Sequence, residues 1–334
     1  AAGRSVSGRV FVLIPTHTTR HLACCLAALA HQARAPDGVV VTCDNDSAEI
    51  ADLLAAWWPR VCAKAGRAIP MWHTRRAHQG EAHLNQVRNN GLRTLISEAG
   101  AEGNDLVVVL DGDTMLAPDA LALHAATRDD GADYIIPYRV LLDEEPTGRI
   151  DAEVVLRDGP DVKRMLTAAE MELLRKRQSR YRRHLLMSRL GLSKPNKPRL
   201  IGGHHAMTIA TAQRVNGFDE DYVGYRFNDD DMARRLNRLR PRPKTVIACD
   251  TIFAFHMWHT IRAPARLQDA PGWSRFNRKD LPVFAEHGIS TPRAQPPVQV
   301  SRVGSGVVVG GRGSADAQHL EQAADQRRAG GGLG

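Results

Sequence analysis

Two aspartates separated by a single glycine, Asp111 and Asp113, directly follow the apolar run Leu106–Leu110. A run that is apolar on both faces is typical of a buried parallel strand, and ligands bind at the ends of such strands. Carboxylates at this spacing can converge on one divalent cation, and oxygen ligands favour Mg²⁺ or Mn²⁺. Such a cation could neutralise the charge on a departing diphosphate. Asp-Gly-Asp is also a common turn sequence, so the pattern indicates a metal site only together with other motifs.

A second block contains three motifs in order: Ile201-Gly-Gly-His-His205, Asn216-Gly-Phe-Asp219 and the three consecutive acids Asp229 to Asp231. If a helix starts there, its dipole favours negative charge in the first turn without any catalytic role. The alternative is a general base, because a carboxylate facing an acceptor can take the proton from an attacking hydroxyl. His204 and His205 could line that acceptor pocket or cap a turn.

The third block, Thr251-Ile-Phe-Ala-Phe-His-Met-Trp-His259, carries two histidines three residues apart. A strand here would end with His256 on the same sheet edge as Asp113, where an imidazole nitrogen could be a third metal ligand. A lone histidine is usually structural, so the pair beside Trp258 is what favours a site.

Alternating strands and helices are predicted to hold these motifs in place. Apolar runs predict strands at 10–14, 38–43, 70–73, 106–110 and 133–137, and helical periodicity predicts helices at 21–33, 48–58, 84–99 and 118–126. Alternation of this kind implies parallel pairing with right-handed crossovers. We therefore expect an α/β fold whose central sheet is mixed, mostly parallel and flanked by helices.

The chain has a formal net charge of +8, and much of this excess lies between residues 163 and 199. Only Glu170 and Glu172 oppose the basic residues there, which are Lys163, Arg164, Arg175, Lys176, Arg177, Arg180, Arg182, Arg183, Arg189, Lys194, Lys197 and Arg199. Residues 161–190 are predicted to form one long basic helix, or two, with an incomplete apolar stripe. The segment could act as an acceptor-side lid, dock on an anionic surface, or remain a solvated helix without a partner.

Composition disfavours several classes of protein. The chain has 334 residues and a hydrophobic fraction of 43%, and no apolar run approaches the roughly 20 residues that span a bilayer. Residues 1–8 lack the apolar stretch of a signal peptide, and the five cysteines are odd in number and form no Cys-x-x-Cys pair. We therefore expect a cytoplasmic protein without disulfides or a zinc site, in peripheral contact with the inner face of the membrane at most. The Ala- and Arg-rich composition favours a bacterial source.

Taken in order, the motifs resemble those of family 2 glycosyltransferases of the GT-A fold over residues 8–262. The resemblance rests on Ile14-Pro-Thr16, Asp44-Asn-Asp46, Arg88-Asn-Asn-Gly91, the Asp-Gly-Asp, the Gly-Gly loop, the Asn-Gly-Phe-Asp and the acidic helix start. Residues 216–236 are also similar to the C-terminal segment of β-1,4-galactosyltransferases and chondroitin polymerases. Two departures stand out: Asn228 replaces the family's usual Glu, and Asn45 interrupts an acid pair.

The resemblance implies a role for each motif. Nucleoside contacts would come from Pro15, Thr16, Asp44 and Arg88, the metal–diphosphate site from Asp111, Gly112 and Asp113, and donor-sugar contacts from Gly202 and Gly203. Asp229 would be the catalytic base, and Asp230 would bind acceptor hydroxyls. His256 would be the late metal ligand, with His259 as the alternative.

The implied activity is a metal-dependent, inverting sugar transfer of the hexosyltransferase type. The donor would be a nucleoside-diphosphate sugar, with UDP-sugar the first choice, and the cofactor Mn²⁺ or Mg²⁺. The acceptor would be a hydroxyl of a glycan, a lipid or a small molecule, and no nucleic-acid partner is expected.

One catalytic domain is expected at 1–293, followed by a flexible Gly-rich tail at 294–334 with a short helix near 319–328. Within the domain we expect a nucleotide-binding half at 8–142, a basic helical insertion at 143–199, an acceptor-binding half at 200–262 and a C-terminal helical extension at 263–293.

Two other functions compete with this one. A sugar-phosphate nucleotidyltransferase would carry a Gly-rich loop after the first strand, but residues 15–20 contain no glycine. A basic nucleic-acid or membrane-surface binding protein would be built around 163–199. The acid clusters at predicted strand ends argue against that as the main function.

Overall fold

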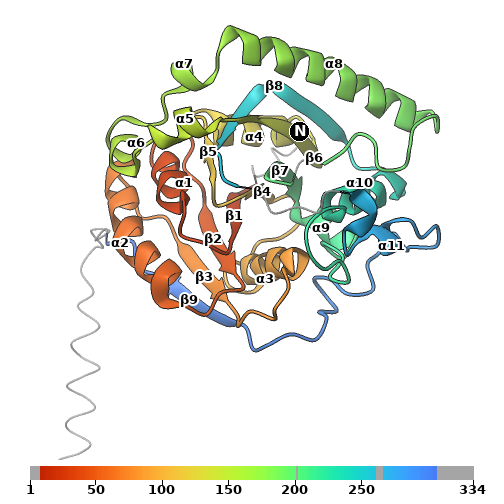
Figure 1. Ribbon diagram of the computed structural model, residues 1–334, viewed down its shortest axis with the longest axis horizontal. Helices are drawn as coiled ribbons and strands as arrows, with labels where there is room; N and C mark the ends of the chain where they lie inside the picture. The colour runs from red at the N-terminus through yellow and green to blue at the C-terminus, as the bar shows by residue number, and fades with distance from the viewer. Residues whose placement is uncertain (1–7, 201, 261–265, 307–334) are drawn as a thin grey trace, which may run out of the picture.

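A nine-stranded mixed sheet forms the centre of the described part of the chain, residues 8–200, 202–260 and 266–306 of this computed structural model (Figure 1). The strand order is β5-β8-β6-β7-β4-β1-β2-β3-β9. Its parallel block contains β1 (Val10–Thr16), β2 (Gly38–Cys43), β3 (Met71–Arg75) and β4 (Leu106–Leu110). The predicted α/β class is confirmed.

Alternating side chains of β1 pack on opposite faces of the sheet. Val12 and Ile14 belong to the core beneath α1 (Leu22–Leu29) and α2 (Ala48–Ala65), whereas Phe11 and Leu13 belong to the core on the other face. Because both faces are covered, the strand has to be apolar at every position. This explains why the central strands read as unbroken apolar runs.

Four further strands complete the site half of the sheet. They are β5 (Thr114–Leu116), β6 (Tyr134–Leu141), β7 (His204–Thr208) and β8 (Thr245–His256). β7 runs antiparallel to both β4 and β6, and β5 runs antiparallel to β8. Neither β5 nor β7 was expected, because β5 has three residues and β7 begins with two histidines.

Further helices cover the sheet. They are α3 (Leu84–Ser97), α4 (Ala120–Asp129), α9 (Ile209–Arg214) and α10 (Asn228–Arg238). α2 continues past its expected end, through Pro59, to Ala65. Val61 and Cys62 in the added turns are fully buried, and this packing favours continuation over a break at the proline.

The 143–199 segment contains α5 (Glu144–Gly148), α6 (Ala152–Asp158), α7 (Val162–Met165) and α8 (Ala168–Arg189). The basic stretch therefore forms two helices, because the Thr167 side chain caps a new start by accepting from the Glu170 N–H. Gln178 fastens α8 to β8: its side chain donates to the Ile247 carbonyl and accepts from the Cys249 N–H, each at 2.8 Å.

No helix in the described ranges combines the length and apolar character that a bilayer crossing requires.

One expectation for the C-terminal part was wrong, and another agrees with the structure only in part. Residues 299–303 were assigned to a flexible tail, yet Gln299–Val303 forms β9, antiparallel to β3. The outer edge of β3 offers unpaired backbone groups, and they favour pairing even with a short polar strand. The 263–293 segment contains, where described, only a 3-10 turn (Leu267–Asp269) and α11 (Trp273–Phe276). The helix expected near 319–328 lies outside the described residues.

Gly91 of the Arg88-Asn-Asn-Gly91 motif faces β1 and β2, and a Cβ there would collide with Leu13 and approach Thr42 Cγ2 to 3.1 Å. We expect Gly91→Val to lower the free energy of unfolding by about 1–3 kcal/mol through overpacking. Gly148→Ala, which meets no neighbour within 4 Å, should change it by less than about 0.5 kcal/mol. Denaturant unfolding of both variants checks this, and equal stability of the two would contradict it.

Candidate active site

The loop after β4 places Asp113 against the end of β8. Thr114 pairs with His256 in the β5–β8 ladder, and the Met257 N–H donates to the Asp113 carbonyl at 2.9 Å. Gly112 in the same loop donates its N–H to the Pro15 carbonyl at 3.3 Å. The ends of β1, β4 and β8 therefore meet at one edge, as the strand pattern predicted.

Asp113, His256 and His259 form a group that could hold a metal ion. Asp113 Oδ1 lies 3.0 Å from His256 Nδ1, and Oδ2 lies 3.1 Å from His259 Nε2. One potential ligand atom from each residue lies within 4.8 Å of the others, and all three side chains are partly exposed. A carboxylate with two imidazoles is a donor set that suits a divalent first-row transition cation.

The charge state of Asp113 agrees with this arrangement. Burial alone would raise the pKa of Asp113, but the hydrogen bond and charge of His256, assisted by His259 and Arg139, hold it below the usual aspartate value. Asp113 is therefore a carboxylate at neutral pH and keeps negative charge available to a cation.

Asp111, expected as a metal ligand, lies outside this group. Its Oδ2 accepts a hydrogen bond from Arg139 Nη1 at 2.9 Å. Arg139 projects from β6, and no sequence pattern pointed to it because it lies within a strand without a recognisable motif. The guanidinium competes for the Asp111 carboxylate, which explains why the two aspartates of one motif have different partners.

The three acids at the start of α10 have three different environments. The Asp231 side chain is fully buried and bound by Arg234 and Arg235, and the Asp230 side chain is 8% exposed and bound by Arg199 and Asn196. The Asp229 side chain remains 35% exposed. Of the three acids, Asp229 is therefore the one with a face open to a ligand, whereas Asp230, expected to bind acceptor hydroxyls, is occupied.

Arg88 lies beside Asp229 rather than beside the nucleoside residues proposed from sequence. Its Nη1 donates to Asp229 Oδ1 at 2.8 Å, its Nη2 donates to the Gly202 carbonyl at 3.3 Å, and its guanidinium lies over the Phe218 ring. The side chain is only 2% exposed. Arg88 thus holds the Asp229 carboxylate, and the nucleoside contact implied by the resemblance stays a prediction.

Gly202 and Gly203 lie between Asp229 and the Asp111–Arg139 ion pair. A Cβ at Gly202 would collide with the Asp229 carboxylate, and one at Gly203 would collide with Arg139 and Asp111. Only glycine permits this close approach. The Gly-Gly loop therefore joins the Asp229 region to the Asp111–Arg139 pair.

Thr16 ends β1, and Asp44 directly follows β2. Thr16 Oγ1 donates to the Thr18 carbonyl at 2.8 Å, and Asp44 Oδ2 lies 3.3 Å from His78 Nδ1. Asp44 is mostly buried at the end of β2. Tyr225 lies near it, since burial and then the Asp44 charge raise the pKa of the Tyr225 hydroxyl. Sequence reasoning missed His78 and Tyr225, which lie in loops.

The backbone that leads into α10 is unusual. Phe227, the residue before the helix, has φ +65°, a left-handed conformation that a bulky side chain adopts at a cost. Its ring stacks on Phe276 with centroids 4.8 Å apart and also packs near Trp273. This aromatic contact holds the turn that aims Asp229 at the Gly-Gly loop.

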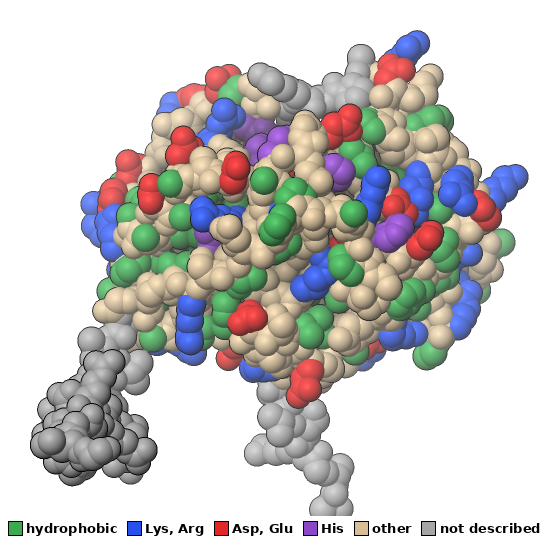
Figure 2. Space-filling view, turned by 90° about the horizontal axis from the view of Figure 1, so that it is seen from below, with side chains coloured by type: hydrophobic (Ala, Val, Ile, Leu, Met, Phe, Trp, Pro, Cys, Tyr) green, Lys and Arg blue, Asp and Glu red, His purple; other side chains and the backbone are tan. Residues whose placement is uncertain are grey.

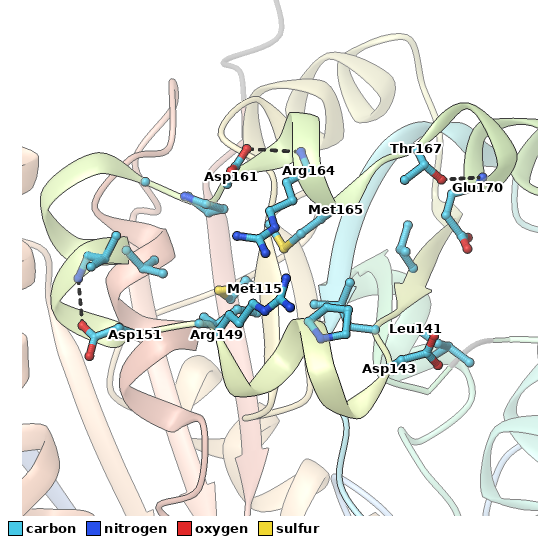
Figure 3. Close-up of a pocket in the computed structure, with 18 residues that line it drawn as sticks. Met115, Leu141, Asp143, Arg149, Asp151, Asp161, Arg164, Met165, Thr167 and Glu170 are labelled. Atoms are coloured by element: carbon cyan, nitrogen blue, oxygen red, sulfur yellow. Dashed lines mark hydrogen bonds between the residues drawn. The ribbon is translucent and has the colours of Figure 1, made fainter.

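Figure 2 shows one face of the molecule, and Figure 3 shows a cavity lined by residues outside the site. Histidine side chains reach the surface beside acidic ones on the face shown in Figure 2. A separate cavity of about 350 Å³ lies between α5, α6, α7 and the start of α8, where Arg149 and Arg164 reach toward each other over Met115 and Met165 (Figure 3). None of the site residues proposed from sequence lines that cavity.

Residues 183–259 match the family model described as the N-terminal domain of galactosyltransferase. No curated protein matches the chain. Similar solved structures include S. aureus TarS 1–349 in complex with UDP-GlcNAc, with 17% identity over 80% of this chain and 64% of that one and a TM-score of 0.47. Another is GalNAc-T7 with UDP, GalNAc and Mn²⁺, with 13% identity over 80% of this chain and 47% of that one and a TM-score of 0.49. The chain spans less than two thirds of either structure's length.

The matched segment contains Gly202, Gly203, Asp229, Asp230 and both histidines of the metal-ligand group. It confirms the resemblance to glycosyltransferases that the motif order predicted.

The geometry separates the roles of the two aspartates of the Asp-Gly-Asp motif. We expect Asp113→Ala to weaken Mn²⁺ binding by more than about 100-fold, and Asp111→Ala by about tenfold or less, because a neighbour of a ligand matters less than the ligand itself. Titration calorimetry, or electron paramagnetic resonance of free Mn²⁺, measures both. Equal losses would make Asp111 a ligand, as the sequence alone suggested.

Proposed function

We propose that this chain is a metal-dependent inverting glycosyltransferase that moves a sugar from a nucleoside-diphosphate sugar to an acceptor hydroxyl. The observation that carries the proposal is the placement of Asp229, the most open of the three α10 acids, across the Gly202-Gly203 loop from Asp111 and Arg139. A base is needed at the acceptor and positive charge at the leaving diphosphate. Asp229 would supply the base, and Arg139 together with a cation at Asp113 would supply the charge.

The nucleoside would lie over Pro15, Thr16 and Asp44, where β1 and β2 end. Asp44 offers a carboxylate to the N–H or O–H donors of a base or ribose, and uracil, with an N–H on its pairing edge, is our choice of base. Tyr225, 46% exposed near Asp44, offers an aromatic surface beside it.

Asp113, His256 and His259 would hold the cation. When bound, it supplies positive charge that stabilises the departing nucleoside diphosphate. The two imidazole ligands favour Mn²⁺ over Mg²⁺, since Mg²⁺ prefers an all-oxygen shell. Arg139 adds a fixed positive charge at the same edge, and its pairing with Asp111 holds it in place.

Asp229 would remove the proton from the acceptor hydroxyl as its oxygen attacks the anomeric carbon. Arg88 occupies Asp229 Oδ1, and the two carboxylate oxygens face the space beside Gly202. A single displacement from the face opposite the leaving group inverts the anomeric configuration. Arg88 acts through Asp229 and is therefore a positioning residue.

The acceptor would approach from the side of Asp230, which anchors Arg199 at the end of the basic segment. The acceptor hydroxyl would belong to a glycan, a lipid or a small molecule. The 163–199 segment would therefore border the acceptor rather than the donor.

Base removal tests the mechanism. We expect Asp229→Asn to reduce kcat by about 10²-fold or more, the usual scale for loss of a general base, with affinity for UDP and Mn²⁺ retained. Asp230→Asn should retain more activity, because its carboxylate serves Arg199. If Asp230→Asn is inactive while Asp229→Asn turns over normally, the base assignment is off by one residue.

Donor binding tests the substrate class. UDP with Mn²⁺ should raise the Tm, since a ligand at 100 times its Kd stabilises by about 2.7 kcal/mol. The increase should be smaller with EDTA and with other nucleoside diphosphates. Full turnover of a UDP-sugar in EDTA would contradict metal dependence.

A further inference from the structure

Four apolar side chains are exposed at the C-terminal end of α8. Leu186, Met187, Leu190 and Leu192 are 55%, 38%, 61% and 74% exposed. We call these four residues the α8 patch. Exposed leucines scattered singly are ordinary on a monomer, but a contiguous group marks an interaction surface.

Helical spacing makes the patch contiguous and turns it outward. Leu190 lies four residues after Leu186 and three after Met187, so it joins both on one face, and Leu192 follows in the turn after the helix. The sheet side of α8 is formed by Leu174, Gln178, Tyr181 and Ser188, which are buried. Figure 1 shows α8 over β8 at the periphery, with the following chain returning toward α10.

Positive charge surrounds the patch. Arg182, Arg183, Arg189 and Lys194 are all exposed, and no ion pair links any of them to another described residue. The sequence has no Asp or Glu between Glu172 and Asp219. Burial and then the charges of Lys197, Arg180 and Arg183 lower the pKa of His184, which agrees with a strongly positive surface.

This combination of residues selects one kind of partner. Nucleic acid would bind the cations but leave the leucines in water, and a second copy of the chain would meet the same uncompensated charge. An anionic bilayer satisfies both sets, because leucines enter the acyl boundary while Arg and Lys contact lipid phosphates.

We propose that the α8 patch and its surrounding cations dock this protein on the surface of an anionic lipid bilayer. The docked end of α8 continues through residues 190–199 to the Arg199–Asp230 ion pair, next to Asp229. If the proposed transferase activity holds, the acceptor hydroxyl is presented at the bilayer surface, so the substrate class is a lipid-linked acceptor.

Vesicle sedimentation with the full chain tests the docking without depending on catalysis. We expect binding to vesicles of equal parts phosphatidylcholine and phosphatidylglycerol, and little binding to phosphatidylcholine alone. Binding should weaken in 1 M salt, where the Debye length falls to about 3 Å. Equal binding to both kinds of vesicle would overturn the proposal.

The variant L186S/L190S/L192S should lower partitioning to the anionic vesicles by about tenfold or more, because apolar burial is lost. R182S/R183S/R189S should remove the preference for anionic lipid. The matched control L267S/F284S changes two half-exposed apolar side chains elsewhere and should bind as the unaltered chain does.

An unchanged denaturant-unfolding midpoint shows that each variant is folded, and unchanged binding of UDP and Mn²⁺ separates docking from the proposed donor site. If the leucine variant binds anionic vesicles as tightly as the unaltered chain, the surface is purely electrostatic and apolar docking is wrong. A dimer that the leucine variant dissociates, without vesicle binding, would assign the patch to a second copy instead.

Discussion

The short pairing of β5 with β8 is the contact on which the site depends. Only three residues of β5 take part, yet they set Thr114 opposite His256 and bring Asp113 within hydrogen-bonding distance of two histidines from a distant part of the chain. The Met257 N–H fixes the loop from the other side through the Asp113 carbonyl. A shift of one residue in this ladder would turn His256 to the opposite face of the sheet.

The second half of the site depends on a buried guanidinium. Arg88 is almost inaccessible, and Asp229 is its ion-pair partner among the described residues. Loss of the partner would leave a buried cation unpaired, which is costly, so the ion pair holds the Asp229 carboxylate in place. The Arg88–Asp229 ion pair thus joins α3 to α10, helices that lie far apart in the sequence, and it also positions the proposed base.

Sequence patterns predicted the parts that depend on local chemistry. Apolar runs predicted β1, β2 and β4, and the motif order singled out Asp113 and His256, which the fold brings together. The role of Asp229 stays a prediction. Patterns could not distinguish Asp111 from Asp113, because Arg139 reaches Asp111 only once β6 and β7 take their places beside β4. Patterns also could not show the partners of Arg88, because they lie on another helix and in a loop. The identity of a residue shows what it can bind, whereas the order of the strands determines which partners lie within its reach.

The last described strand has a consequence for solubility. β9 covers the outer edge of β3, where Trp72 and other apolar residues would otherwise border open backbone groups, and Arg302 lies over the Trp72 ring. β9 itself is short and polar, with Ser301 and Arg302 near its centre, so it is a poor template for another strand. The sheet therefore ends in a segment that discourages edge-to-edge aggregation. A chain cut before residue 299 would expose the edge of β3, which is more prone to pair with another chain.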